Sequence, residues 1–498
     1  MFLLPSFPAL WLTTACTTGP VLILTDVGNP DDTDTIPSHH LDSGSDSHPT
    51  ETGTGDDDTG GDPPPQSSLI AFEDGSPPTN VLMISIDTLR TDFLGRYAMV
   101  DDALHNRSPT LDRLLEEGVA LDRHRSCSNW TYHSMICALS GRDAIDAGYI
   151  PHSSTHGIDL RPLPSKIPIL PDFMTAAGYQ TALLSTNAWL NSDFNIATRY
   201  DHFIVDYGLT AQETFDASMD LLETLKASGS PWLLHVHTLE PHTPYASPEE
   251  YILDSELEVL GYSLRTNDGV AHLVERYGGL TEYEQGLMRD YAKQLYSADV
   301  AYTDVALGQF LDTLDAAGDL DDTLVVIFSD HGEQLWQRGQ LAHGHELHSE
   351  EADALGLFWA KDILPAAVSF PTTHRDLLPT LFDVLGIAGA ESGWGRVLEL
   401  DEEDAPVFST HLIDEFTLQS VDVGMQRLVF RWDGTLEFFE LITDPHERRG
   451  EFPPDNTDVA TLWQILLPEV QELDAYFPYV SPVFPEDLVT TPPVAQSP

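Results

Sequence analysis

Four short hydrophobic runs recur along the first two thirds of the chain, and each is apolar on both faces instead of alternating with polar residues. Strands buried inside a parallel sheet have this pattern, because helices cover both faces of such a sheet. The runs therefore predict four buried strands: VLMISI (81–86), TALLST (181–186), WLLHVH (232–237) and LVVIFS (324–329).

The stretches between these runs carry apolar residues at helical spacing, as in 108–119, 169–179 and 284–318. Alternation of strands and helices on this scale predicts an α/β fold, in which helices sandwich a mostly parallel central sheet. Ligands bind such sheets beyond the carboxyl ends of the strands, so the residues that follow each run are the first candidates for a site.

Beyond about residue 400 the pattern changes to short alternating strands, VFSTHLI, QRLVFRW and LEFFELI, with an Asp-Gly turn at 433–434. This pattern predicts a smaller antiparallel sheet. We divide the chain into a signal-like segment, an acidic tether that is too polar to pack, a main α/β domain, a C-terminal subdomain and an irregular tail. Their expected bounds are 1–16, 17–67, 68–395, 396–480 and 481–498.

The net charge of −58 at pH 7 argues against nucleic-acid partners, because their phosphates would be repelled. No internal run of the sequence is long and apolar enough for a membrane span. The first segment, MFLLPSFPALWLTTAC, resembles a bacterial lipoprotein signal in which Cys16 is the lipidated residue. We therefore expect an exported, periplasmic or surface protein of the cell envelope that contacts the membrane only through this anchor. The alternative is a cytosolic chain with a frayed N-terminal tail.

The other two cysteines, Cys127 and Cys137, lie ten positions apart. A disulfide between them is compatible with an oxidising compartment, and two unpaired core thiols are an equal alternative. The cysteines do not form a metal-binding motif, so any metal site has to be sought among histidines and carboxylates.

Polar side chains follow the predicted strands directly. Asp87 comes after the first run, and Asp330 and His331 come after the fourth. A histidine nitrogen together with carboxylate oxygens suits Zn or Mn better than Ca, which favours oxygen ligands alone. Taken singly, Asp87 could instead cap the next helix, and the Asp330–His331 pair could be an ordinary turn.

Two histidine-rich segments also fall at this expected edge of the sheet. HVHTLEPHTPY supplies His237 and His242, and AHGHELHSEE supplies His343, His345 and His348. So many histidines on such segments are hard to explain as packing. Histidines in this position could bind a metal, neutralise an anionic substrate or protonate a leaving group.

Eight segments of the chain occur in one order: SIDTLRTD, SPTLDRLLEEG, SNWTYHSMICALSGR, HVHTLEPHTPY, FSDHGE, HGHELHSEE, DLLPTLFDVLGI and FELITDPHERRGE. In this order they resemble the sulfatases of the alkaline phosphatase superfamily, over roughly residues 79 to 455. The resemblance implies an alkaline-phosphatase-like core with a C-terminal subdomain. It also implies a metal-dependent hydrolase acting on a sulfate or phosphate ester.

Carried over residue by residue, the resemblance implies that Asp87, Asp330 and His331 are metal ligands. It also implies that Thr131, in SNWTYHSMICALSGR, is the nucleophile, whose hydroxyl contacts the metal as well. The remaining expected site residues share an imidazole side chain. His242 is expected to contact the anionic group and take part in catalysis, and His237 together with His343 or His345, between which we do not choose, is expected to bind the substrate.

Two departures from the family pattern affect the chemistry. Many sulfatases have two consecutive aspartates where this chain has Asp87 and Thr88, so one ligand of a calcium site is missing. They also have Cys or Ser at the nucleophile, oxidised to formylglycine, and Arg four positions later, where this chain has Thr131 and Met135. Threonine cannot become that aldehyde, so we expect no formylglycine. Attack by the threonine hydroxyl, followed by water, favours a phosphate ester over a sulfate ester.

The sequence therefore predicts a metal-dependent hydrolase of a small anionic ester, with Zn or Mn favoured and Ca as the alternative metal. One alternative function is a phosphoethanolamine-type transferase acting on envelope components. Another is a degenerate sulfatase that serves as a binding protein. The alternative for Thr131 itself is a plain helix N-cap.

Overall fold

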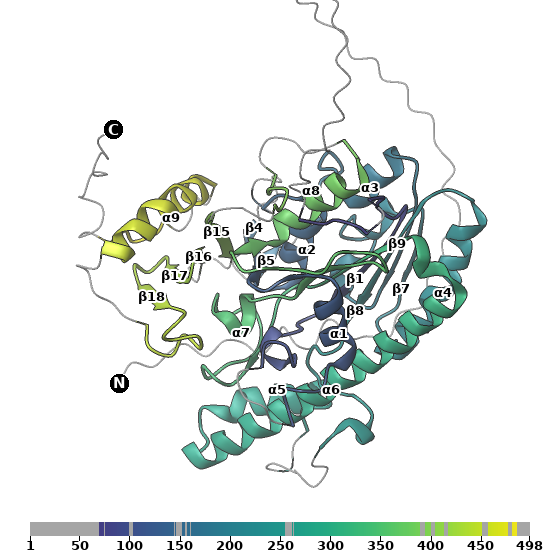
Figure 1. Ribbon diagram of the computed structural model, residues 1–498. Helices are drawn as coiled ribbons and strands as arrows, with labels where there is room; N and C mark the ends of the chain where they lie inside the picture. Colours follow the sequence, from purple (N-terminus) through teal and green to yellow (C-terminus); the bar gives the residue numbers. More distant parts are fainter. Residues whose placement is uncertain are drawn as a thin grey trace, which may run out of the picture.

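The computed structural model describes residues 69–485, except for 74, 99–102, 144, 146–151, 155–156, 160, 254–260, 262, 389–393, 400–403, 413–416, 451–456 and 477–480. Within these residues an eight-stranded sheet forms the centre of the molecule (Figure 1). Its strands lie in the order β13 (Ala366–Val368), β2 (Val119–Leu121), β12 (Gly356–Trp359), β9 (Thr323–Ser329), β1 (Asn80–Ile86), β8 (Trp232–Thr238), β6 (Gln180–Ser185) and β7 (His202–Val205).

The five adjacent strands from β9 to β7 are parallel, β12 is antiparallel to both of its neighbours, and β13 is parallel to β2. This arrangement confirms the predicted mostly parallel sheet, with all four hydrophobic runs in its centre. In the register, Ile86 of β1 pairs with Thr238 of β8 and with Ser329 of β9. The residues that follow these strands therefore emerge together at one edge of the sheet.

Helices cover both faces of the sheet. Alternate residues of each strand point to opposite faces, so each strand contributes side chains to two cores. Val81 and Met83 of β1 pack in one core, and Leu82 and Ile84 pack in the other. Figure 1 shows the two layers on either side of the sheet. The first core includes α2 (Thr131–Ser140), α3 (Leu170–Ala176) and α8 (His374–Leu385), and the second includes α1 (Pro109–Glu117), α4 (Ala211–Ala227), α5 (Asn267–Tyr277) and α6 (Glu282–Ala317).

A separate four-stranded antiparallel sheet lies beside the core and is covered by α9 (Thr457–Tyr476), shown in yellow in Figure 1. The Asp-Gly turn joins its last two strands, where Gly434 has a positive φ of 97°. Three of the strands were predicted. The fourth, β16, has the polar sequence LQSVDV, which carries a weak strand signal. The strands are β15 (Val407–His411), β16 (Leu418–Val423), β17 (Gln426–Arg431) and β18 (Leu436–Glu440).

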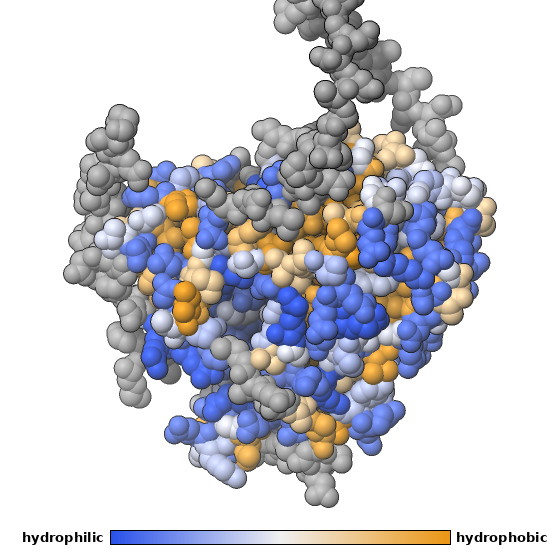
Figure 2. Space-filling view, viewed as in Figure 1, coloured by the Kyte–Doolittle hydropathy of each residue, from blue (hydrophilic) through white to orange (hydrophobic). Residues whose placement is uncertain are grey.

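Short elements connect these layers. They are β3 (His124–Arg125) paired with β14 (Thr372–Thr373), β4 (His152–Ser154) with β5 (Gly157–Asp159), β10 (Gln334–Leu335) with β11 (Leu341–Ala342), and α7 (Ser349–Ala352). The face in Figure 2 is largely hydrophilic, with hydrophobic side chains in small groups. Among the described residues, every helix is too short or too polar to cross a bilayer. The signal-like segment with Cys16 and the tether lie outside the described residues, and the domain bounds stay predictions.

Candidate active site at the edge of the central sheet

Two carboxylates and one imidazole meet at the carboxyl edge of the sheet. Asp87 follows β1, and Asp330 and His331 follow the adjacent β9. One ligand atom from each of the three lies within 4.8 Å of the others, and all three side chains are fully buried. The structure therefore brings the predicted ligand Asp87 to the other two, Asp330 and His331, from which the sequence separates it by more than two hundred residues.

The chemistry of this group fits a divalent cation. Asp87 Oδ1 and Asp330 Oδ2 are buried and accept no hydrogen bond. Burial works to raise the pKa of Asp87, but the hydrogen bond to His237 and nearby histidine charges outweigh it and hold this pKa below its usual value. Burial and the Asp87 charge raise the pKa of Asp330. Two close carboxylates cannot both ionise cheaply without a cation, so a metal would be held by Asp87, Asp330 and His331.

Thr131 is the first residue of α2 and points at this group. Its Oγ1 lies 3.5 Å from Asp87 Oδ2 and 3.4 Å from His331 Nε2. Trp130, not Thr131, occupies the N-cap position, and it makes no side-chain cap. The alternative of Thr131 as a helix N-cap is therefore wrong: α2 begins one residue earlier than that alternative requires, and the hydroxyl faces the carboxylate edge.

Asn187 is a member of the site that the sequence analysis missed. It follows β6, and its Nδ2 donates to Asp87 Oδ2 at 2.5 Å and to Thr131 Oγ1 at 3.3 Å. The side chain is 5% exposed. The signal that could have found it is the same as for Asp87, because Asn187 is a polar residue directly after a hydrophobic run.

His237 lies inside β8 and is fully buried. Its Nδ1 is 2.7 Å from Ser85 Oγ, and its Nε2 is 3.4 Å from Asp87 Oδ2. Both ring nitrogens therefore have protein partners, which fixes the ring orientation beneath Asp87. The geometry favours a supporting position for His237, whereas the sequence analysis expected it to contact the substrate.

His242 and His343 form the partly exposed side of the site. Their Nε2 atoms are 3.1 Å apart, and the His343 ring lies 4.4 Å from the His331 ring between centroids. Burial lowers the pKa of His343, with the charges of His331 and His242 acting in the same direction. His345 turns away, since its Nε2 contacts the Leu341 carbonyl at 3.1 Å. Of the two candidates that the sequence left open, the structure brings His343 to the site.

The two positions that depart from the family pattern have different environments. Thr88 has a φ of 54°, rare for a β-branched residue, and its backbone N–H donates to Asp330 Oδ1 at 3.0 Å. This position therefore supplies a backbone donor in place of a second carboxylate. Met135 is fully buried in the core formed with α2. An apolar side chain thus fills the position where the resemblance implies a guanidinium.

A disulfide joins Cys127 to Cys137 of α2, with Cα atoms 6.4 Å apart. It closes the short loop that carries Thr131 in its middle. The Cys127 carbonyl also accepts a hydrogen bond from the Thr410 N–H of β15, at 2.7 Å. The loop that presents the Thr131 hydroxyl is therefore tied both to its own helix and to the C-terminal sheet.

A buried network of hydrogen bonds connects this loop to the histidine-rich segment. Asn129 Nδ2 donates to Glu351 Oε2 at 3.0 Å, and the His345 N–H donates to the same oxygen at 2.9 Å. Asn129 Oδ1 lies 2.7 Å from Nδ1 of His411, the last residue of β15. Glu351 thus fixes the Thr131 loop relative to the segment that carries His343.

Burial raises the pKa of Glu351 to about 8. The folded chain therefore keeps a proton that the unfolded chain releases at lower pH, so stability is lost as pH rises toward about 8. We expect the melting temperature of Glu351→Gln to exceed that of the wild type by more at pH ~8 than at pH ~5. Differential scanning calorimetry of both proteins measures this. A pH-independent difference would contradict the role given to the Glu351 proton.

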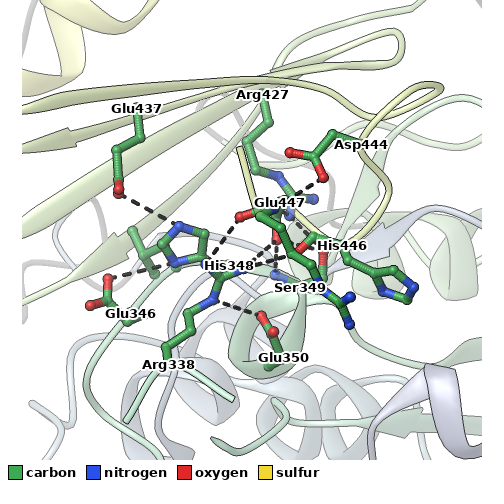
Figure 3. Close-up of polar contacts among 12 residues, drawn as sticks. Arg338, Glu346, His348, Ser349, Glu350, Arg427, Glu437, Asp444, His446 and Glu447 are labelled. Atoms are coloured by element: carbon green, nitrogen blue, oxygen red, sulfur yellow. Dashed lines mark hydrogen bonds and ion pairs between the residues drawn. The ribbon is translucent and has the colours of Figure 1, made fainter. Parts of the chain in front are cut away.

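A second group of one histidine and two carboxylates lies between the segment before α7 and the C-terminal sheet (Figure 3). His348 Nδ1 is 3.6 Å from Glu346 Oε2, and His348 Nε2 is 3.5 Å from Glu437 Oε2. Arg431 contacts both of these carboxylate oxygens. The guanidinium already pairs with both carboxylates, so we interpret this group as an anchor for the C-terminal sheet.

Arg427 of β17 is the centre of the same anchor and is 2% exposed. It donates to Asp422 at 2.7 Å and to Asp353 at 2.9 Å, and it also contacts Glu447. We expect Arg427→Ala to lower the free energy of unfolding by about 3–5 kcal/mol, because it removes the guanidinium that pairs most closely with the buried carboxylates of Asp422 and Glu447. Urea denaturation measures this, with the exposed Arg449→Ala as control. A loss as small as in the control would contradict the anchor.

The comparisons with known proteins agree with this architecture. A family model described as Sulfatase matches residues 79–387. A choline-sulfatase of Rhizobium meliloti (strain 1021) is 25% identical over 446 residues, which cover 77% of this chain and 84% of the relative. Two solved structures share the fold. A 2-O GAG sulfatase has a TM-score of 0.64 at 17% identity, covering 84% of this chain and 97% of that chain. A phosphonate monoester hydrolase from Silicibacter pomeroyi has a TM-score of 0.60 at 20% identity, covering 80% and 96%.

Proposed function

This chain belongs to the sulfatase family of ester hydrolases, and from that membership we propose that Thr131 is its nucleophile and that its substrate is a phosphate ester. The observation that carries the proposal is the position of the Thr131 hydroxyl. It lies within 3.5 Å of Asp87 and His331, two of the three groups suited to hold a metal. A divalent metal bound there would supply Lewis-acid activation of the hydroxyl.

The reaction divides into two displacements at phosphorus. Thr131 Oγ1, with its hydrogen directed to Asp87 Oδ2, forms the first new O–P bond as the bond to the leaving alcohol breaks. His242, whose Nε2 lies 3.1 Å from His343 Nε2, protonates that alcohol. Water then attacks phosphorus and gives one proton back to His242, the bond to Thr131 breaks, and the proton held by Asp87 returns to Thr131 Oγ1. Asn187 donates to Thr131 Oγ1 and holds it in place.

The first turn of α2 supports anion binding at the same point. Thr131 opens a ten-residue helix, and the N–H groups at the start of a helix carry a partial positive charge. A substrate phosphoryl group beside Thr131 Oγ1 would lie next to these donors. The favourable interaction is about 0.3–1 kcal/mol at exposed sites and larger when buried.

We also propose that the metal is Zn or Mn, because the ligand set includes an imidazole and lacks the second aspartate of a calcium site. The proposed location is the cell envelope, with Cys16 as lipid anchor. The disulfide between Cys127 and Cys137 supports an oxidising compartment.

The experiment that tests the function loads the purified protein separately with Zn, Mn and Ca. It compares turnover of nitrophenyl esters of phosphate and of sulfate. We expect phosphate-ester turnover with Zn or Mn to exceed sulfate-ester turnover. Dominant sulfate turnover with Ca would contradict the threonine chemistry. No turnover, with no metal retained, would favour the binding protein, and turnover only with an added alcohol acceptor would favour the transferase.

A further inference from the structure

The turn that follows β1 contains a residue in an unfavourable backbone conformation. Thr88 comes directly after the proposed ligand Asp87 and has a φ of 54°, in the left-handed region that β-branched residues rarely adopt. The Thr88 side chain does not account for this conformation, because its Oγ1 is buried and makes no hydrogen bond. Conformations of this kind persist only where surrounding groups hold them. Another part of the structure therefore holds Thr88.

The conformation of Thr88 bears on which oxygen of Asp330 is left for a cation. The Thr88 N–H donates to Asp330 Oδ1 at 3.0 Å, and the His331 N–H donates to the same oxygen at 2.8 Å. Asp330 Oδ2 is buried and accepts no hydrogen bond. The two donors satisfy Oδ1 and fix the rotation of the carboxylate, which leaves Oδ2 for a metal.

Tyr296 of α6 holds the turn at two points. Its hydroxyl donates to the Thr88 carbonyl at 2.7 Å, and the Arg90 N–H donates to the Tyr296 Oη at 2.8 Å. One hydroxyl thus bridges a carbonyl and an N–H that lie two residues apart in the turn. The Tyr296 side chain is fully buried, so water does not compete for either bond.

The ring that carries this hydroxyl is fixed by its aromatic neighbours. It packs edge-on against Phe93, with 4.7 Å between ring centroids, and against Tyr245, with 5.8 Å. Tyr245 is itself bonded, since its hydroxyl donates to Glu333 Oε1 at 2.5 Å. The position of the Tyr296 hydroxyl is therefore set by α6 and by this packing.

We propose that Tyr296 is a positioning residue for the metal site. Its hydroxyl holds Thr88 in the left-handed conformation, and the Thr88 N–H in turn orients the Asp330 carboxylate. Tyr296 itself bonds to backbone groups and not to a ligand, and none of these hydrogen bonds requires a change of charge. The inference rests on the metal site proposed at Asp87, Asp330 and His331.

The experiment measures the dissociation constant for Zn by competition with a chromophoric chelator. Tyr296→Phe removes the hydroxyl and keeps the ring. Tyr302→Phe is the matched control, because Tyr302 is a buried tyrosine of the same helix whose hydroxyl accepts from the Gln212 N–H at 3.4 Å. We expect the dissociation constant to rise by about tenfold or more in Tyr296→Phe and to stay within about twofold in the control. Equal affinity in Tyr296→Phe and the wild type would overturn the proposal.

A glycine at position 88 tests whether the hydroxyl acts through Thr88. Glycine adopts a positive φ without the steric cost that threonine has, so it does not need to be held. We expect Tyr296→Phe to weaken Zn binding by no more than about threefold when it is added to Thr88→Gly. A full loss in both backgrounds would show that Tyr296 does not act through the conformation of Thr88, which would overturn the proposal.

Amide hydrogen exchange of Thr88 in the metal-free proteins gives a measurement that needs no bound metal. We expect exchange of this N–H to be about tenfold faster in Tyr296→Phe and unchanged in Tyr302→Phe, because the hydroxyl protects the turn from local opening. Unchanged exchange in Tyr296→Phe would overturn the proposal. Faster exchange together with no Zn binding by the wild type would support the role of Tyr296 in the turn and overturn the proposed metal site.

Discussion

Thr131→Ala is expected to lower kcat for phosphate-ester turnover by about a thousandfold or more, while the protein still folds and still retains metal. This change removes the hydroxyl and the γ-methyl group, and of the two only the hydroxyl can attack the ester. Thr131 Oγ1 also lies at the long end of hydrogen-bond distance from Asp87 and His331, so its loss leaves few bonds broken. Steady-state kinetics with a nitrophenyl phosphate ester measure the effect.

Thr131→Ser is the matched control, because it keeps the hydroxyl and removes only the methyl group. We expect this variant to retain a large part of the wild-type rate. Near-normal turnover by Thr131→Ala would mean that water attacks the ester directly. In that case Thr131 would be a neighbour of the site and not its nucleophile.

Asp330→Asn is expected to abolish tight metal binding. It is also expected to lower kcat by about as much as Thr131→Ala does. Asp330 Oδ2 is buried without a hydrogen-bond partner, and the change replaces an anionic ligand with a neutral amide. Metal content per chain after dialysis, measured by mass spectrometry, is the direct readout. Because Asp330 Oδ1 accepts from the N–H groups of Thr88 and His331, the amide oxygen can keep part of the local structure.

Asp304→Asn is the control for burial alone. Asp304 is also buried, but its carboxylate accepts from the N–H groups of Thr110 and Leu111 at the start of α1. We expect this control to retain its metal. Equal metal content in wild type and Asp330→Asn would place the metal elsewhere, and equal loss in both variants would indicate general unfolding.

The fold was predictable because burial on both faces leaves a clear signal in the sequence. The hydrophobic run that became β1 matches the observed strand to within one residue, and the long helical stretch became α6. Asp87 and Asp330 were predictable for the same reason, since they directly follow such runs. β16 was missed because its sequence LQSVDV owes its strand structure to pairing with β15 and β17, which no local pattern records.

The parts of the site that the sequence did not resolve depend on contacts between distant segments. His343 and His345 have the same side chain in one short segment, and only the contacts with His242 and Leu341 distinguish them. The disulfide was equally undetermined, because ten-residue spacing is compatible with bonded or free cysteines. The hydrogen-bond network through Glu351 joins segments more than two hundred residues apart, so only the fold reveals it.

The most direct test of the account is to stop the reaction with acid during turnover of a phosphate ester and to map the modified peptide by mass spectrometry. The account predicts a phosphoryl ester on Thr131, within the peptide that also contains Trp130 and Tyr132, and no such group in Thr131→Ala. Turnover without any modified residue, or with the phosphoryl group on a different side chain, would contradict Thr131 as the nucleophile.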